Sequence, residues 1–421
     1  MGAGRASRVA AVIDAGERLA ITSIAAGGDG VGRSEGVVVF VPRTAPGDVA
    51  RVRLVRAKRF ARGRLLSLDE PSPDRVEPPC PHYTGDRCGG CQLQHLRYDA
   101  QIAAKRAIIG DALRRIGRRD VADPEVEPSD SAWRYRRKLT LHVRRTGARW
   151  IAGLHPYDDP SAVFDLVDCP ITDERVLAIW RELRPTLDRL PRDPALRVAV
   201  RLLDDGAAAT VEGGRAWPAA DALFAAVPSL TELWWKPEAG ALRRLAARTH
   251  PPQAGASFVQ VNARVAARLH DALLAAVRAV DPARVIDAYA GTGATAIPLA
   301  TDGRIVVAME LDRAAADHIG ARLSPPSSVV AGRVEEHIAA ALPADVVLLN
   351  PPRTGVDERV AMALERARAD VRRVFYVSCD PATLARDLAR MPGYRLVTVR
   401  GFDMFPQTAH VETLCELEGG R

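Results

Sequence analysis

The sequence of 421 residues lacks any apolar run close to the roughly 20 residues that span a bilayer. The apolar stretch near its start, Val9 to Ile13, is also too short for the core of a secretory signal. No internal repeat or low-complexity tract stands out. The lack of long apolar runs argues against a membrane-spanning helix. We therefore expect a cytoplasmic protein with no membrane partner, and nothing here implies an obligate protein partner.

Cysteine is scarce as well, and its six positions are Cys80, Cys88, Cys91, Cys169, Cys379 and Cys415. The composition, 47% hydrophobic and 26% charged, is ordinary for a globular protein, so full cores can form without disulfides. In a reducing compartment, clustered cysteines indicate a metal site or catalysis.

Acidic side chains are slightly outnumbered, with 52 Asp and Glu against 59 Lys and Arg, which gives a net charge of +7. The excess is concentrated, because residues 51–64 and residues 134–149 each hold seven basic side chains. Such clusters suit a polyanion such as RNA. A single basic cluster is also typical of a solvated surface, so the prediction of a polyanionic partner has to rest on sequence motifs as well.

The first part of the chain, residues 14–70, alternates short apolar runs with glycine-rich turns. This pattern predicts four or five short strands in a small β-barrel of the oligonucleotide-binding type. The proline-rich stretch Pro71 to Pro79 ends it. A helix is expected over residues 100–118, and residues 133–250 mix strands with helices in an unclear topology.

From Ser257 onward the pattern becomes a regular alternation of strands and helices. The predicted strands are 284–288, 304–310, 345–349, 374–378, 395–400 and 410–417. The predicted helices are 263–280, 293–301, 312–323, 357–368 and 381–391. This alternation predicts a doubly wound α/β domain. The expected domains are thus a barrel (1–72), a central α+β domain (73–255) and an α/β domain (256–421).

The run from Tyr376 to Pro381 is the strongest chemical signal, because an apolar strand ends abruptly at Cys379. In open α/β sheets, ligands bind at the carboxyl ends of the strands. A cysteine there is a candidate nucleophile, since a thiolate is a strong nucleophile near neutral pH. The alternative is a small core residue, because free cysteine is often buried.

Two further loops follow predicted strands. In Asp287 to Ala294, glycines let a ligand approach the backbone and a helix amino terminus, and Glu310 ends the next strand, where it can accept from ribose hydroxyls. The alternatives are a tight turn or a dinucleotide site, because Gly291 to Ala296 also fits Gly-x-Gly-x-x-Ala. Asn350, before two prolines, puts a fixed polar group at the same edge; a plain proline turn is its alternative.

Near the end of the chain, Glu412 is a candidate general base, because a carboxylate near the reacting atom can remove a proton. Taken alone, Glu412 could equally be an exposed strand charge, and the nearby His410 a strand histidine without a chemical role.

Five ordered motifs together resemble the RNA uracil-carbon-5 methyltransferase family, which uses S-adenosylmethionine, over nearly the whole chain. They are Ser257 to Asn262, Asp287 to Gly293, Asn350 to Arg353, Ser378 to Asp387, and Asp403 to Glu412. The resemblance implies a Rossmann-like class I methyltransferase domain behind an N-terminal TRAM domain, a small RNA-binding barrel.

The resemblance also assigns roles. Cys379 would attack carbon-6 of uracil, carbon-5 would then take the methyl group, and Glu412 would remove the carbon-5 proton. The residues expected to contact the cofactor or the target base are Gln260, Tyr289, Gly291, Gly293, Glu310 and Asn350. For Asn262, with Gln260 beside it, a helix cap is the alternative. Base flipping fits Trp133 and Tyr135 as RNA contacts, and a core position is the alternative for Trp133.

Two positions depart from the family. The family usually has aspartate where this chain has Asn350, which accepts hydrogen bonds but carries no charge. Some members carry a polar cofactor contact where this chain has Ala294.

Four cysteines form a candidate metal site: Cys80, Cys88, Cys91 and Cys169. Four soft ligands fit an iron–sulfur cluster or tetrahedral zinc, and their spacing does not choose between the two. The resemblance implies a [4Fe–4S] cluster, with zinc as the alternative, although the family's first gap is usually shorter. The Cys-x3-Cys-x2-Cys spacing of radical enzymes is absent, which favours a structural or RNA-positioning cluster. Cys415 is expected in the core.

We therefore expect 5-methyluridine synthesis in structured RNA, with ribosomal RNA favoured over transfer RNA. The rival hypotheses are a catalytically impaired RNA-binding iron–sulfur protein, supported by Asn350 and Ala294, and a dinucleotide oxidoreductase, supported by Gly291 to Ala296 alone.

Overall fold

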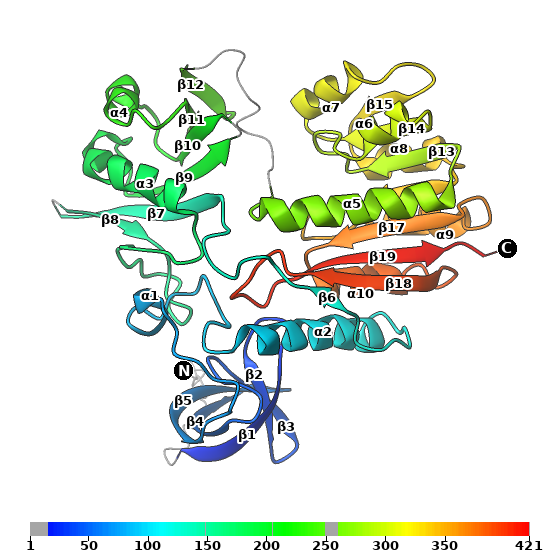
Figure 1. Cartoon of the computed structure of the whole chain (residues 1–421). Helices are drawn as coiled ribbons and strands as arrows, with labels where there is room; N and C mark the ends of the chain where they lie inside the picture. The colour runs from blue at the N-terminus through cyan, green and yellow to red at the C-terminus, as the bar shows by residue number, and fades with distance from the viewer. Residues whose placement is uncertain (1–15, 148, 204, 249–259, 421) are drawn as a thin grey trace, which may run out of the picture.

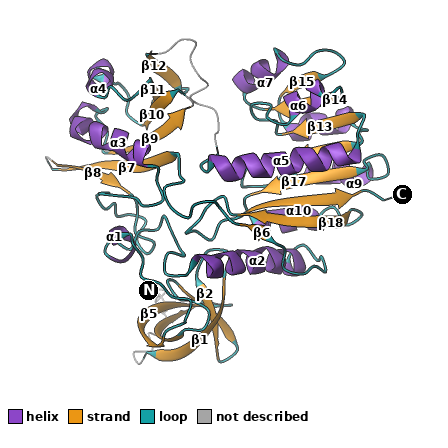
Figure 2. Ribbon diagram, in the orientation of Figure 1, coloured by secondary structure: helices purple, strands orange, loops and turns teal. Residues whose placement is uncertain are grey.

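The computed structural model describes residues 16–147, 149–203, 205–248 and 260–420. Three sheets organise the chain (Figure 1). A closed barrel lies at one end, a six-stranded sheet covers the middle of the sequence, and an eight-stranded sheet is flanked by helices (Figure 2). Among the described residues, no helix is both long and apolar enough to cross a membrane.

The barrel has the strand order β1-β2-β3-β5-β4. Its strands are β1 (Glu17–Ile24), β2 (Gly30–Ser34), β3 (Val37–Val41), β4 (Val49–Arg56) and β5 (Ala61–Glu70). Alternate residues such as Leu19 and Ile21 point inward and are buried, which is the period-two pattern of a half-buried strand. The predicted small barrel is confirmed.

The segment after the barrel connects the barrel to the eight-stranded sheet. It comprises α1 (Pro81–Thr84), α2 (Tyr98–Arg115) and β6 (Val126–Glu127). Helix α2 contacts β1 of the barrel on one side and α10, β6 and β18 on the other. Strand β6 pairs in parallel with β18 and so extends the eight-stranded sheet. Part of the stretch assigned to the central domain therefore packs on the C-terminal sheet.

The middle sheet has the order β12-β11-β10-β9-β7-β8. Its strands are β7 (Lys138–Thr146), β8 (Arg149–Gly153), β9 (Ala195–Leu203), β10 (Gly206–Glu212), β11 (Glu232–Lys236) and β12 (Arg243–Ala247). The accompanying helices are α3 (Glu174–Leu183), η1 (Arg184–Arg189) and α4 (Ala220–Ala226). Residues of α3, including Trp180, share a hydrophobic core with this sheet.

The eight-stranded sheet has the order β15-β14-β13-β16-β17-β19-β18-β6. Its other strands are β13 (Arg284–Ala288), β14 (Ile305–Glu310), β15 (Ser328–Ala331), β16 (Val346–Leu349), β17 (Arg373–Ser378), β18 (Arg395–Phe402) and β19 (Glu412–Glu418). The order reverses at β13, which makes the ends of β13 and β16 the switch point where ligands bind. Strand β19 runs antiparallel between β17 and β18.

Helices cover both faces of this sheet. They are α5 (Ala263–Val280), α6 (Ala296–Thr301), α7 (Arg313–Gly320), α8 (Val334–Ala341), α9 (Glu358–Arg366) and α10 (Pro381–Ala389). One core packs α2, α8, α9 and α10 against one face, and the other packs α5, α6 and α7 against the opposite face. Successive residues of β17, such as Phe375 and Tyr376, belong to opposite cores. The doubly wound prediction is confirmed.

The sequence pattern missed β6, β15 and α8, which are short elements. It also began the last strand at His410, whereas β19 begins at Glu412. The predicted boundary between residues 255 and 256 lies outside the described residues, so the division into domains stays a prediction.

Candidate active site

Parallel register aligns the ends of the central strands. Ala288 pairs with Met309 on one side and Leu349 on the other, and Leu349 pairs with Tyr376. The next residues along three of these strands, namely Tyr289, Glu310 and Asn350, therefore lie in one row at this end of the sheet. The structure brings these three predicted ligand contacts together at the switch point.

Antiparallel register sets Cys379 against Glu412. Ser378 is the last residue of β17 and pairs with Thr413 of β19. One step further along both strands, Cys379 stands opposite Glu412. The electrostatic effect of the Glu412 carboxylate on the Cys379 thiol agrees with this placement. Two predicted catalytic groups, 33 residues apart in the sequence, therefore share one end of the sheet.

The turn that carries Cys379 is fixed by its neighbours. Asp380 caps α10, since its side chain accepts hydrogen bonds from the Ala382 and Thr383 amides at 2.9 Å each. Pro381 occupies the first turn of the helix, where its fixed φ is suited. Cys379 is thus the single residue between the strand and the helix cap, and it is partly exposed.

Arg353 is a site residue that had no assigned role in the sequence interpretation. Its guanidinium lies near enough to the Cys379 side chain to lower the pKa of that thiol. Burial and the Glu412 charge raise the pKa of the Cys379 thiol, and the Arg353 charge opposes them. A cation at this position favours the thiolate. The Asn350 to Arg353 motif was the available signal, but a proline turn alone does not show what its arginine faces.

The loop that carries Arg353 is held by α10. The Arg386 guanidinium donates to the Thr354 carbonyl at 2.7 Å, and Asp387 accepts from the Val356 amide at 3.0 Å. The Tyr376 hydroxyl donates to the same Asp387 carboxylate at 2.8 Å. Asp387 is fully buried, and its partners satisfy its charge. These contacts explain why the motif after Cys379 extends to Asp387.

Glu412 is nearly enclosed, with 5% of its surface exposed. Burial raises the pKa of Glu412 to about 7, while Arg353 acts in the opposite direction. A carboxylate whose pKa lies near the operating pH is suited to general base catalysis. His410, which precedes β19, is exposed, and its ring lies 5.9 Å from that of Phe405.

The glycine loop after β13 is built for close approach to a ligand. Tyr289, Gly291 and Gly293 all have positive φ angles, which only glycine adopts freely. A Cβ atom at Gly291 would face open space, whereas one at Gly293 would meet Ile297 at 2.8 Å. Gly291 therefore leaves room beside the loop, and Gly293 permits the helix to pack.

Glu310 already organises this loop. Its carboxylate accepts hydrogen bonds from the Gly291 and Asp312 amides, each at 2.8 Å. Asp287, 2% exposed, accepts from the Thr295 hydroxyl, and burial raises the pKa of Asp287 to about 7. Both carboxylates thus shape the loop before any ligand enters.

Asn350 and Gln260 are the remaining predicted contacts. Asn350 is exposed, and the Ala294 carbonyl accepts from His270 at 2.7 Å. Asn262 caps α5 through the Val265 amide, as the alternative interpretation held. Gln260 is half-buried two residues earlier. The first part of this motif, residues 257–259, lies outside the described residues.

The four predicted metal ligands line one cavity of about 100 Å³. Cys80, Cys88 and Cys91 are buried, and Cys169 is partly exposed. The Gln94 side chain also lines this cavity and acts to lower the pKa of the Cys80 and Cys91 thiols, against the larger opposite effect of burial. Among the described residues, no three Cys, His, Asp or Glu side chains are arranged as ligands of a single metal ion.

Arg43 reaches this cavity from the barrel. Its guanidinium lies 3.2 Å from the centre of the Tyr83 ring and donates to the Cys88 carbonyl at 2.6 Å. Its second terminal nitrogen is buried and has no hydrogen-bond partner within the described residues. A partly buried cation beside Cys80, Cys88 and Cys91 fits a group that carries negative charge on their sulfur atoms.

The basic clusters are partly neutralised. In the barrel, Arg51, Arg56 and Arg62 form ion pairs with acidic residues, and Arg134 pairs with Asp168 and Glu174.

The interpretation of Tyr135 as an RNA contact is wrong. This residue is 8% exposed, and its hydroxyl donates to the Pro406 carbonyl at 3.0 Å. Trp133 is half-buried against the cysteine cluster.

Comparison with known proteins defines the class. The family model described as tRNA (Uracil-5-)-methyltransferase matches residues 333–418. The tRNA (uracil-54, C5)-methyltransferase of Pyrococcus abyssi, solved with S-adenosyl-L-homocysteine, has 22% identity and a TM-score of 0.71, and the match covers 95% of this chain and 99% of that one. The fold is that of an S-adenosylmethionine-dependent methyltransferase with a barrel at its amino end.

Sequence relatives narrow the class to a family. A 23S rRNA (uracil(1939)-C(5))-methyltransferase, RlmD, of Pseudomonas putida is 32% identical, covering 96% of this chain and 94% of the relative. An RNA methyltransferase of Protochlamydia amoebophila is 30% identical, covering 94% and 96%. The chain belongs to the RNA uracil-5-methyltransferase family. This membership overturns the oxidoreductase interpretation of Gly291 to Ala296.

Proposed function

We propose that the protein methylates carbon-5 of a uridine in RNA, with Cys379 as nucleophile and Glu412 as base. The observation that carries the proposal is the register that sets Cys379 opposite Glu412, with the Arg353 charge beside the thiol. All three groups stand at the sheet edge that also presents the glycine loop.

Each of these residues has a defined task. The Cys379 sulfur bonds to carbon-6 of the ring, and the electron pair of the C5=C6 bond moves toward carbon-5 as an enolate. S-adenosylmethionine, when bound, supplies the methyl group to carbon-5. Glu412 then takes the carbon-5 proton, the C5=C6 bond re-forms, and the Cys379 thiolate leaves. Arg353 stabilises the thiolate before attack and after release.

Cofactor contacts follow from the row of strand ends. We assign Tyr289, Gly291, Gly293 and Glu310 to the cofactor, because they surround the switch point. Gln260 and Asn350 are assigned to the cofactor or the target base.

A methylation assay with labelled S-adenosylmethionine tests the reaction. The Cys379→Ala variant should transfer no methyl group, and turnover at the wild-type rate would reject the nucleophile. Glu412→Gln should accumulate a covalent protein–RNA adduct on denaturing gels, because the last step loses its base. A wild-type protein that neither binds the cofactor in calorimetry nor methylates RNA would instead support the catalytically impaired alternative.

Ribosomal RNA is the proposed substrate. The support is that the relative from Pseudomonas putida, which aligns along nearly the whole chain, is a 23S rRNA enzyme. The structural neighbour acts on transfer RNA and shares less sequence. Matched transcripts of both RNAs decide this point, and preferential methylation of the transfer RNA would overturn the assignment.

We also propose that Cys80, Cys88, Cys91 and Cys169 hold a [4Fe–4S] cluster. The support is that all four thiols line one cavity, that the Gln94 side chain lines it too, and that the Arg43 guanidinium lies beside three of the cysteines. Iron and sulfide analysis of anaerobically purified protein should find about four of each per chain. One zinc ion per chain and no iron would favour the alternative tetrahedral site.

A further inference from the structure

The connection between β18 and β19, Asp403 to Val411, is unusually well buried for a loop. Asp403, Gln407 and Thr408 are at most 3% exposed. The connection is also anchored where it ends, because Phe402 pairs with Glu412 across the hairpin. Its conformation therefore sets the position of Glu412, the proposed base, at the start of β19. We call this connection the base segment.

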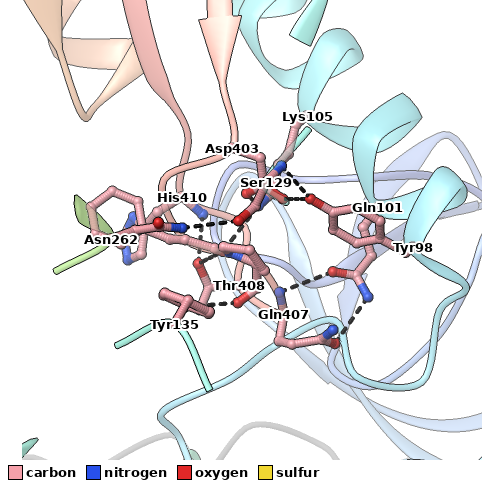
Figure 3. A network of polar contacts seen from close by, with 12 residues as sticks. Tyr98, Gln101, Lys105, Ser129, Tyr135, Asn262, Asp403, Gln407, Thr408 and His410 are labelled. Carbon is pink, nitrogen blue, oxygen red and sulfur yellow. Dashed lines mark hydrogen bonds and ion pairs between the residues drawn. The ribbon is translucent and has the colours of Figure 1, made fainter. Parts of the chain in front are cut away.

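Helix α2 holds the base segment from outside the catalytic sheet (Figure 3). Tyr98 donates to the Asp403 carboxylate at 2.7 Å, and the fully buried Lys105 pairs with the same carboxylate. Lys105 also donates to the Phe405 carbonyl at 3.0 Å. These contacts fix the start of the base segment.

Gln101 holds the middle of the base segment through two hydrogen bonds. Its side-chain oxygen accepts from the Gln407 amide at 3.0 Å, and its side-chain nitrogen donates to the Gln407 side chain at 3.0 Å. The same nitrogen donates to the Leu96 carbonyl at 2.9 Å. Gln101 is 1% exposed, so its polar atoms depend on these partners.

Gln407 itself is strained. Its φ of 70° lies in the left-handed region, which costs on the order of 1 kcal/mol for a residue with a side chain. Such a conformation persists only when the surroundings hold it. The Gln407 carbonyl accepts from the amides of Gln92 and Leu93, which directly follow the ligand Cys91. The barrel also reaches this point, since a Cβ at Gly28 would lie 2.4 Å from Gln92.

We propose that Gln101 is a positioning residue: its amide holds Gln407 in the strained turn and thereby aims the Glu412 carboxylate at the carbon-5 proton. The inference rests on the proposed function of Glu412. It assigns to α2, which lies outside the catalytic sheet, a part in the last chemical step.

A pair of substitutions separates hydrogen bonding from space filling. Gln101→Met keeps the volume and loses both bonds to Gln407. Gln101→Glu keeps an acceptor for the Gln407 amide, and the Gln407 side chain can turn its own amide toward the second oxygen. If Gln101 positions Gln407, Gln101→Glu should be more active than Gln101→Met. If Gln101 only fills space, the Met variant is better, because burying a carboxylate is costly.

The experiment follows one turnover with RNA and S-adenosylmethionine and measures adduct formation and adduct release separately. Gln101→Met should slow release about 100-fold, with formation and cofactor affinity within about threefold of wild type. Gln101→Glu should recover release to within about tenfold of wild type. Arg114→Met on the same helix, where Arg114 pairs with Asp111 and Asp123, is the control and should leave release unchanged.

Three results would overturn the proposal. They are an unchanged release rate in Gln101→Met, an equal loss of formation and release, and a Glu variant worse than the Met variant. Calorimetric cofactor binding reports whether each variant is folded. A wild-type protein that forms no adduct would remove the proposed function itself, which this assay distinguishes from a failure of Gln101 alone.

Discussion

The molecule uses cysteine in two contrasting regions. Cys379 stands at a strand end, partly exposed, beside Arg353 and Glu412. Cys91 lies in an enclosed cavity among three other thiols, and burial raises its pKa far above the usual range. The first environment keeps a thiol reachable by a substrate and supplies a cation for its charged form. The second buries three of its four thiols and suits them to holding a group between them.

The comparison shows that the side chains around a cysteine, and its exposure, decide which chemical role suits it. Cys415 belongs to neither region, because it is fully buried in the core of the catalytic sheet with an apolar surrounding that raises its pKa to about 12. It was expected in the core, and that prediction is confirmed. It also serves as the matched control for the other two.

The largest effect is expected at the strand end. Cys379→Ala should lower methylation on the order of 10⁴-fold, because the covalent step has no other nucleophile. Cys415→Ala should stay within about twofold in rate and lose about 1 kcal/mol in the free energy of unfolding. Methylation rates and denaturant melts of both variants check this contrast, and equal rates would break it.

Arg353 should produce the next largest effect. Arg353→Met removes the cation that favours the Cys379 thiolate, so the rate near pH 7 should fall about 100-fold. The loss should shrink at pH 9, where hydroxide helps to form the thiolate. Arg353→Lys keeps a charge and should lose less. A loss in Arg353→Met that is independent of pH would contradict the electrostatic role.

Substitution of a cysteine in the cavity should affect metal content and leave adduct formation nearly intact. Cys91→Ser should abolish bound iron while Cys379 still forms the adduct within about tenfold of the wild-type rate. Cys379→Ala should show the reverse, full iron content and no adduct. Iron analysis and adduct gels on both variants measure the two properties. If each variant lost both iron and adduct formation, the two regions would not have separate roles.

The smallest effect concerns stability. Because burial raises the pKa of Glu412 to about 7 from an ordinary value of 4.5, its ionisation opposes folding above that range. Stability from this group is present at low pH and declines as pH rises from about 4.5 to 7. Glu412→Gln should therefore raise the free energy of unfolding by on the order of 1–3 kcal/mol at pH 8 and much less at pH 5. Urea melts at both pH values test the sign.

Much of this organisation was predictable from sequence patterns. The alternation after Ser257 located Ala263–Val280 and Arg284–Ala288 with their observed bounds, because long periodic segments give strong signals. The strand end at Cys379 was also visible, since Asp380 and Pro381 mark a helix start.

Other features depend on tertiary contacts that no local pattern encodes. The two-residue strand Val126–Glu127 forms only because β18 offers an edge. Tyr135 looked like an exposed aromatic in a basic stretch, yet its hydroxyl is buried on the base segment. Arg353 and Gln101 act through residues 26 and 306 positions away, which spacing alone cannot reveal.

The most direct test of the account is to map the covalent bond itself. Protein is incubated with S-adenosylmethionine and RNA that contains 5-fluorouridine. In this nucleotide fluorine replaces the hydrogen on carbon-5, so the base has no proton to remove there and the adduct persists. After digestion, mass spectrometry should find a methylated nucleotide on the peptide that contains Cys379 and on none that contains Cys80, Cys88, Cys91 or Cys169. A nucleotide attached to one of those four, or attached nowhere while methyl transfer to natural RNA continues, would contradict the assignment of the two regions.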